Sequence, residues 1–227
     1  MTLLGDLARA INLRDLGGLR VDGGGVTAPG RLYRSGRLDD LDLATRRDLI
    51  ESLGITDVVD LRHRVGCYHG PAVTMHSLPL NALGTNPIVD PVDTYESVGE
   101  WYLRQLTLGA ERLRRIVELV ATSQGATLIH CHAGKDRTGS VVALILSAVG
   151  VVREDVVRDY ALTGRVAGDR FLEALPPKFS EADPETMWSF FARLDAEYGS
   201  VPGFLESIGI EPETVRLLRG RLVVGCD

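Results

Sequence analysis

The chain has 227 residues, 44% of them hydrophobic, and its 25 Lys and Arg against 31 Asp and Glu give a net charge of -6. This length and apolar content allow a sizeable core in one domain, so we expect a single domain over residues 1–227. The acidic balance argues against a general role in binding nucleic acid or an anionic membrane surface.

The cysteines and the apolar segments predict a cytoplasmic protein. Cys67, Cys131 and Cys226 are too few and too scattered for a disulfide framework or a zinc site, which fits a reducing compartment. Residues 1–10 contain an aspartate and lack the apolar core of a secretory signal. The longest uncharged apolar stretch, residues 141–152, is too short to span a membrane. Export without a recognisable signal remains an alternative.

The first two thirds of the chain alternate strand and helix patterns. Glycine clusters between apolar residues predict a hairpin, an apolar face followed by Gly54 predicts a helix, and short apolar runs predict buried strands. The expected elements are a hairpin over 17–34 with a strand at 31–34, a helix over 43–53, strands over 56–61 and 75–80, a loop over 81–96, a helix over 97–122 broken around Gly109, and a strand over 126–129.

The last third of the chain has only helical patterns, separated by Gly or Pro. The helices are expected over 153–163, 166–175, 184–198, 201–208 and 211–219. Strands separated by helices predict an α/β fold with a central, mostly parallel sheet flanked by helices, followed by a helical C-terminal third. An active site at the carboxyl end of a central strand follows the general rule for such sheets.

The sequence His-Cys-His-Ala-Gly-Lys-Asp-Arg-Thr-Gly at residues 130–139 joins the strand over 126–129 to the next helix. Consecutive backbone N–H groups that curl into a tight loop, closed by a helix N-terminus, bind an oxyanion such as phosphate. Gly134 permits a backbone bend that a Cβ would hinder. The residues expected to surround the phosphate are His132, Ala133, Gly134, Lys135, Asp136 and Arg137.

Cys131, at the head of this loop, is the expected nucleophile. The backbone amides, the helix dipole and the cations Lys135 and Arg137 favour its thiolate over its thiol, and the thiolate is the reactive form. The planar fork of Arg137 suits two phosphate oxygens. Thr138 is expected to donate a hydrogen bond to the sulfur and to help it leave in a second step.

Two other interpretations of the loop are weaker. A buried structural cysteine with a salt-bridged arginine would not require the strand before the loop, the internal glycine and the Thr-Gly pair behind it. A nucleotide-binding P-loop requires Ser or Thr after its lysine and a glycine at its start, where this chain has Asp136 and Ile129.

At these residues the chain resembles the Cys-x5-Arg protein tyrosine phosphatase superfamily, and more narrowly the bacterial tyrosine/serine protein phosphatases whose loop reads HCxAGKDRTG. The loop is also similar to that of phosphoinositide phosphatases of the phosphatase-and-tensin type. Similarity to the bacterial family extends to residues 12–18, 30–36, 53–62, 159–160 and 198–200. The resemblance implies a protein tyrosine phosphatase-like fold and a phosphocysteine intermediate. No metal or other cofactor is expected, because the arginine and the backbone dipoles stabilise the charge.

The identity of the general acid stays open at this point. The resemblance implies Asp136, although an aspartate in the first turn of a helix is also favourable for structural reasons alone. Asp90 or Asp93, in the loop over 81–96, would match the mobile-loop aspartate of many tyrosine phosphatases. A solvated loop carboxylate is the simpler interpretation of both.

Several other polar residues are expected to support the site. The phosphoinositide-type loop implies that Lys135 binds a second anionic group, with electrostatic support of the thiolate as the alternative. His130 is expected to orient the loop, His132 to be a neutral, exposed imidazole, and Cys67 to be a small apolar residue rather than a disulfide partner of Cys131. The residues expected in a buried polar network behind the loop are Arg14, Asp15, Asp60 and Arg62.

These features predict a cysteine-dependent phosphomonoester hydrolase, in first place a protein tyrosine or dual-specificity phosphatase. A phosphatase of small metabolites, nucleotides, sugars or inositol-type phosphates is the second hypothesis. A phosphate-binding pseudophosphatase that docks partners is the third, and the intact Cys131 and Arg137 argue against it. The sequence predicts no oligomeric state, and no partner other than the phosphorylated substrate.

Overall fold

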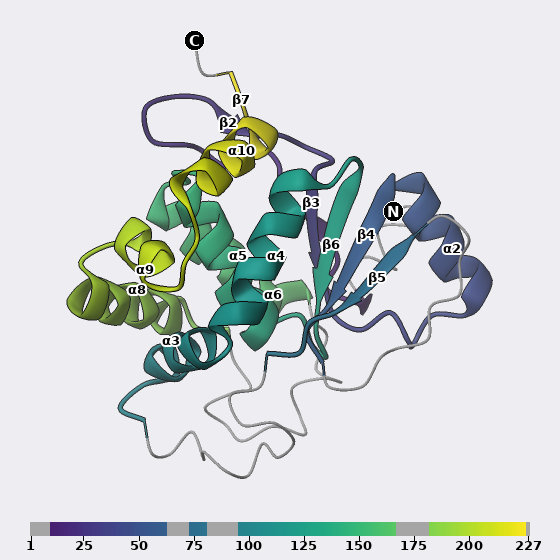
Figure 1. The fold of residues 1–227 in the computed structure, drawn as a ribbon. Coiled ribbons are helices and arrows are strands. Elements are labelled where there is room, and N and C mark those ends of the chain that lie inside the picture. Colours follow the sequence, from purple (N-terminus) through teal and green to yellow (C-terminus); the bar gives the residue numbers. More distant parts are fainter. Residues whose placement is uncertain (1–9, 63–72, 81–94, 167–181, 226–227) are drawn as a thin grey trace.

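The structure is a computed structural model that describes residues 10–62, 73–80, 95–166 and 182–225 (Figure 1). The helix expected over 166–175 lies almost wholly outside these residues, and so does most of the loop expected over 81–96. Within the described ranges, no helix is long and apolar enough to cross a membrane.

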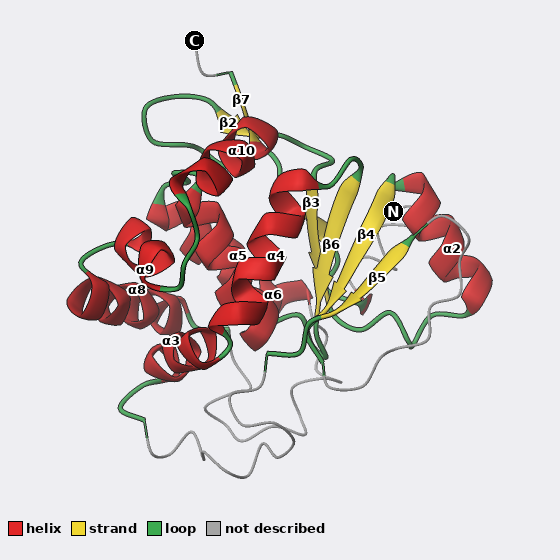
Figure 2. Cartoon of the chain, viewed as in Figure 1, coloured by secondary structure: helices red, strands yellow, loops and turns green. Residues whose placement is uncertain are grey.

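A five-stranded sheet forms the centre of the fold, in the order β1-β3-β6-β4-β5 (Figure 2). The strands are β1 (Arg14–Asp15), β3 (Leu32–Ser35), β6 (Ala126–His130), β4 (Ile55–Asp60) and β5 (Thr74–Ser77). Four of them run parallel, and β1 pairs antiparallel with β3 at one edge. The mostly parallel sheet expected from the alternating pattern is therefore confirmed.

Helices cover both faces of the sheet, as a buried parallel sheet requires. On one face α2 (Leu43–Ser52) packs through Leu49 and Ile50 against Val58 and Leu128 of the sheet. The helices of the other face are α3 (Val98–Leu108), α4 (Ala110–Thr122), α5 (Asp136–Ala148), α6 (Arg153–Val166), α8 (Pro184–Tyr198), α9 (Val201–Ser207) and α10 (Pro212–Leu222) (Figure 1). The helices after α5 confirm the helical C-terminal third.

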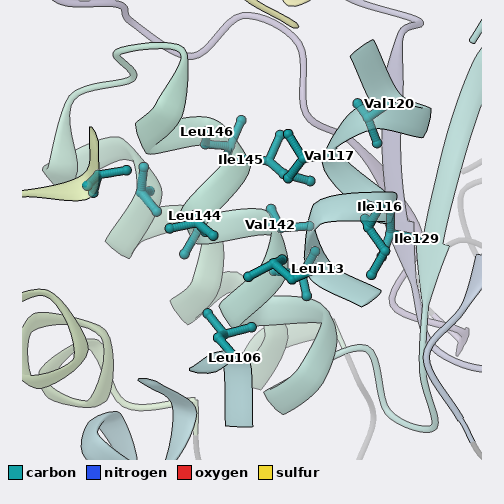
Figure 3. Packing of buried hydrophobic residues seen from close by; sticks show 14 of the residues in the cluster. Leu106, Leu113, Ile116, Val117, Val120, Ile129, Val142, Leu144, Ile145 and Leu146 are labelled. Atoms are coloured by element: carbon teal, nitrogen blue, oxygen red, sulfur yellow. The ribbon is translucent and has the colours of Figure 1, made fainter. Parts of the chain in front are cut away.

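The larger of two apolar clusters lies between the sheet and the helices of this second face (Figure 3). Nine consecutive residues of α5, from Thr138 to Leu146, are buried, which is the pattern of a helix surrounded by protein on all sides. Side chains of α3, α4 and α5 join Ile129 of β6 in this cluster (Figure 3). The element that follows the 130–139 sequence is thereby fixed at the middle of the core.

The short strands differ most from expectation. β5 ends at Ser77, before the expected end at Leu80, and neither β1 nor β7 (Val223–Val224) was expected. The two arms of the expected hairpin are joined by a bridge between Arg20 and Val26 and by backbone hydrogen bonds of Thr27 with Gly18 and Leu19. In addition, β2 (Val26–Thr27) pairs with β7 in a separate two-stranded sheet. Strands of two residues carry no readable alternation, so contacts between distant segments decide their pairing.

The backbones of α3 and α8 approach closely at Gly99. A Cβ built on Gly99 would lie 2.3 Å from the backbone nitrogen of Phe190 and 2.7 Å from the carbonyl oxygen of Thr186. Neither backbone atom can rotate away as a side-chain end can. A glycine at this position therefore sets how close α3 lies to α8.

We predict that Gly99→Ala lowers the free energy of unfolding by about 1–3 kcal/mol, because the two helices must separate to admit the methyl group. Denaturant titration measures the change. Gly220→Ala in α10 is the control, since a Cβ there meets nothing within 4 Å. Alanine suits a helix better than glycine, so this control should gain about 0.5–1 kcal/mol. Equal effects of the two substitutions would contradict the close approach at Gly99.

Candidate active site

The Cys131 loop, residues 131–136, begins where the central strand β6 ends. At that edge His130 of β6 lies in register with Ser35 of β3 and Asp60 of β4, so three carboxyl ends meet beside the loop. Cys131 is a free thiol with 3% of its surface exposed. The expected nucleophile therefore stands at the carboxyl end of the central strand, where parallel sheets carry their sites.

Gly134 gives the Cys131 loop its bend. Its φ is +71°, and a Cβ at this position would lie 2.5 Å from the carbonyl oxygen of Ser35. Backbone strain and a steric clash therefore both require glycine here. Beyond the bend, α5 has no side-chain cap at its N-terminus, so the N–H groups of its first turn are available to an anion.

Two buried side chains hold the carbonyl groups of the loop. The Asn12 amide donates to the carbonyl oxygens of Ala133 (3.0 Å) and Gly134 (3.3 Å), and Arg34 Nη2 donates to the same Gly134 oxygen (2.7 Å). A trans peptide places its N–H opposite its carbonyl. Fixing these carbonyls on one side of the loop therefore turns the following amides to the other side, as an oxyanion cradle requires.

Asp159 of α6 holds both of these donors in position, Arg34 by direct contact and Asn12 through Arg14. One of its oxygens accepts from Arg34 Nη1 (2.5 Å) and the other from Arg14 Nε (2.6 Å), and Arg14 Nη1 donates in turn to Asn12 Oδ1 (2.5 Å). Burial alone would raise the pKa of Asp159, but the charges and hydrogen bonds of Arg34 and Arg14 outweigh it and hold the pKa below 3.8. The carboxylate is thus ionised at neutral pH.

A second ion pair supports the opposite side of the loop. Asp60, fully buried at the end of β4, accepts from Arg62 N (2.9 Å) and Arg62 Nη2 (2.8 Å). His130 Nε2 lies 3.8 Å from the same carboxylate, and burial holds the pKa of His130 below 6.5. Arg137 Nη1 donates to the Leu61 carbonyl (3.2 Å), so the end of β4 also anchors the guanidinium of the loop.

Three guanidinium groups act on His132, the residue that follows the nucleophile in the Cys131 loop. Partial burial, together with the charges of Arg37, Arg137 and Arg62, lowers the pKa of His132 below 6.5. Its imidazole is therefore uncharged at neutral pH. Arg37 pairs with Asp40, and Arg62 pairs with Asp39 and Asp60, so carboxylates offset much of the positive charge near it.

Asp136 lies in the first turn of α5, with 19% of its side chain exposed. Its Oδ1 accepts a hydrogen bond from Tyr102 Oη (2.6 Å) and lies 3.5 Å from Lys135 Nζ. Tyr160 Oη is 2.8 Å from Tyr102 Oη. The hydroxyl of Thr138 is buried within the same turn and has no hydrogen-bond partner in the described part of the chain.

A family model described as the tyrosine phosphatase family matches residues 5–224. The chain belongs to this family. The triple specificity protein phosphatase PtpB of Mycobacterium tuberculosis is 32% identical over 277 aligned residues, which cover 96% of this chain and 98% of PtpB. A tyrosine-protein phosphatase of Nostoc commune is 28% identical over 218 residues, covering 82% of this chain and 71% of its own.

The crystal structure of TpbA from P. aeruginosa covers 71% of this chain and 86% of its own, at 20% identity and a TM-score of 0.37. A likeness at that level carries no argument. The family assignment rests on the two sequence comparisons, and it makes the chain a phosphatase, a hydrolase of phosphoric monoesters.

The structure of this phosphatase gathers the residues expected from its sequence in one loop and one helix turn. They are Cys131, His132, Ala133, Gly134, Lys135, Asp136, Arg137 and Thr138. Asp90, Asp93 and Cys67 lie outside the described residues. Among the described residues, no group of three or more His, Cys, Asp or Glu side chains is placed to hold a metal ion.

The expected polar network was right in part. Arg14 joins it, and Asp60 and Arg62 form a separate pair, but Asp15 lies at the surface, where it binds the N–H groups of Gly17 and Gly30. The residues that sequence reasoning did not assign to the site are Asn12, Arg34, Tyr102, Asp159 and Tyr160. Four of these five fall within the stretches that resemble the bacterial family, which is the one signal that pointed to them.

We predict that Asp159→Asn lowers the free energy of unfolding by about 3–5 kcal/mol at neutral pH, because Arg14 and Arg34 lose their buried counter-charge. The folded state depresses the pKa of Asp159, so its contribution is fully present above about 3.8 and is lost as the pH falls further. Denaturant titrations of both proteins from neutral pH downward should therefore converge at acidic pH. If the free energies of unfolding of the two proteins instead differed by the same amount at every pH, Asp159 would not be the ionised partner of Arg14 and Arg34.

Asp155→Asn is the matched control. Asp155 is also a buried carboxylate of α6, but its partners Arg20 and Arg158 are mostly exposed and have no contact with the Cys131 loop. Loss of this carboxylate should leave phosphatase turnover unchanged, whereas Asp159→Asn should reduce it by loosening the loop.

Proposed function

We propose that this chain is a protein tyrosine or dual-specificity phosphatase that acts through a phosphocysteine intermediate. One observation carries the proposal. The thiol of Cys131 stands at the carboxyl end of β6, at the head of a loop whose carbonyls are tied away by Asn12 and Arg34. In the proposed mechanism the loop amides, Arg137 and the N-terminus of α5 bind the phosphate in front of the sulfur.

The phosphate dianion binds in the cradle formed by the amides of residues 132–137, with the fork of Arg137 on two of its oxygens. The residues assigned to this binding are His132, Ala133, Gly134, Lys135, Asp136 and Arg137. As phosphorus is transferred, charge develops on oxygens that already face these fixed dipoles. This arrangement supports a mechanism in which the chain supplies the charge stabilisation without a metal.

In the first step the Cys131 thiolate attacks phosphorus, the ester P–O bond breaks, and its electron pair leaves with the alkoxide or phenoxide. Asp136 protonates that oxygen, and a phosphocysteine remains. In the second step Asp136 takes a proton from water, the water oxygen attacks phosphorus, and the P–S bond breaks. The orphaned hydroxyl of Thr138 is available to donate to the departing thiolate.

Lys135 supports this mechanism as a buried charge. Its side chain is 1% exposed, and its ammonium lies beside the Asp136 carboxylate, so we assign it electrostatic support of the loop rather than a second anionic group of the substrate. This assignment favours phosphotyrosine and related phosphoprotein substrates over inositol-type phosphates. Small-molecule phosphates remain the second hypothesis.

We place the whole of residues 1–227 in a single phosphatase domain, and we assign the protein to the cytoplasm. The family match over residues 5–224 supports the first assignment. A free nucleophilic thiol supports the second, since a reducing compartment keeps it from oxidation.

We predict that Cys131→Ser lowers the turnover of p-nitrophenyl phosphate by about 10³-fold or more, because the nucleophile is lost. Wild-type activity should persist in EDTA. Phosphate should still raise the melting temperature of Cys131→Ser, since the amides and Arg137 remain in place. Turnover that survives the substitution, or that disappears in EDTA, would refute the thiolate mechanism.

We predict that Asp136→Asn slows hydrolysis of phenyl phosphate by about 10²–10⁴-fold, the usual contribution of a general acid, and slows p-nitrophenyl phosphate far less. The difference arises because a good leaving group departs without protonation. The kcat/KM values of the two substrates measure it, because they report the steps up to phosphocysteine formation and not the second step, in which Asp136 acts on both substrates alike. Unchanged kinetics in Asp136→Asn would transfer the acid role to Asp90 or Asp93, and Asn variants of those two residues would then show the loss.

A further inference from the structure

A tyrosine that belongs to no loop of the site contacts the proposed acid. Tyr102 of α3 is fully buried, and its hydroxyl donates to Asp136 Oδ1 over 2.6 Å. Burial, reinforced by the neighbouring Asp136 charge, raises the pKa of Tyr102 well above 10, so the hydroxyl keeps its proton. A charge-assisted hydrogen bond of this length is among the stronger ones in proteins.

A chain of hydroxyl groups stands behind Tyr102. Tyr160 Oη of α6 lies 2.8 Å from Tyr102 Oη, and the Tyr160 side chain is itself buried. The Tyr102 hydrogen is committed to Asp136, so Tyr160 donates to Tyr102. Hydrogen bonds that all point one way polarise one another, and this series ends on Asp136.

The ring positions leave this chain little freedom. The Tyr102 and Tyr160 rings meet edge to face, with centroids 6.2 Å apart. A Cβ on Gly139, in the first turns of α5, would lie 2.9 Å from Cδ2 of Tyr160. Gly139 therefore allows the Tyr160 ring to lie directly against α5, close to the turn that carries Asp136.

The contact distinguishes the two oxygens of Asp136. Oδ1 accepts from Tyr102, whereas Oδ2 accepts no hydrogen bond from any described residue. A protonated carboxyl group held in this way carries its proton on Oδ2, because Oδ1 must remain an acceptor.

We propose that Tyr102, supported by Tyr160, is a positioning residue that fixes the Asp136 carboxyl group and assigns its transferable proton to Oδ2. This inference rests on the proposed role of Asp136 as the general acid. Tyr102 does not touch the reacting atoms. It determines which oxygen gives a proton to the leaving group and later takes one from water, and proton transfer is sensitive to such orientation.

The test compares p-nitrophenyl phosphate with phenyl phosphate as substrates of the full-length protein. A correctly placed general acid accelerates the hydrolysis of phenyl phosphate, and it matters little for the hydrolysis of p-nitrophenyl phosphate. Tyr102→Phe should therefore slow phenyl phosphate by about tenfold and p-nitrophenyl phosphate by less than about twofold. The ratio of the two kcat/KM values, which leave out the shared hydrolysis of the phosphocysteine, is measured on one preparation, so any fraction of unfolded protein cancels from it.

Tyr198→Phe is the matched control, because Tyr198 of α8 places its hydroxyl 3.5 Å from that of Thr107 on α3 and does not contact the site. Its rate ratio should equal that of the wild type. Tyr160→Phe, which keeps the Tyr102 contact and removes the donor behind it, should give an intermediate ratio. The double variant Tyr102→Phe/Asp136→Asn should resemble Asp136→Asn alone, since a positioning residue has nothing to position there.

The outcomes separate this inference from the proposed function. A ratio that changes in Asp136→Asn but not in Tyr102→Phe overturns the positioning role and leaves the acid assignment intact. A Tyr102→Phe effect that persists in the Asp136→Asn background also overturns it, because Tyr102 would then act elsewhere. A ratio that changes in neither single variant refutes the role of Asp136 as acid, and the inference falls with it.

Discussion

The arrangement of the site depends on one buried carboxylate shared by two buried guanidinium groups. Asp159 binds Arg34 and Arg14 at once, and this leaves Arg34 Nη2 aimed at the Gly134 carbonyl. Ion pairs of this kind cost desolvation energy and add little net stability. Their effect here is geometric, because Arg34 held at one end by Asp159 has a single direction in which to hold the Cys131 loop at the other.

Two consecutive residues of α6 reach both functional parts of the site. Asp159 acts through Arg34 on the loop carbonyls, and Tyr160 acts through Tyr102 on Asp136. Gly139 of α5 makes room for both, since a Cβ there would lie 2.9 Å from Tyr160 and 3.4 Å from Arg34 Nη2. No local pattern explains the glycine of the Thr-Gly pair, and the packing of α6 against α5 is what requires it.

How much of the structure can be predicted from the sequence depends on how far apart along the chain the interacting residues lie. The strand, loop and helix around Cys131 were predictable, because a contiguous segment with an internal Gly134 has few conformations open to it. Contacts such as Arg34 to Gly134 join residues 100 positions apart, and no local pattern encodes them. Tyr102 is the extreme case. In an amphipathic helix it is indistinguishable from any buried aromatic residue until α3 is placed against α5.

Charge explains why an acidic protein can hold an anion at this position. Beneath the loop, two guanidinium groups share the one carboxylate of Asp159, so the buried network carries an excess positive charge. Burial and the neighbouring charge of Arg34 lower the pKa of Arg14 to about 10, which still leaves it protonated at neutral pH. The excess lies behind the backbone amides and the N-terminus of α5, and all three favour negative charge in the cradle. The nucleophile and the bound phosphate of the proposed mechanism would both complement that field, so the network that shapes the loop also supports the proposed function electrostatically.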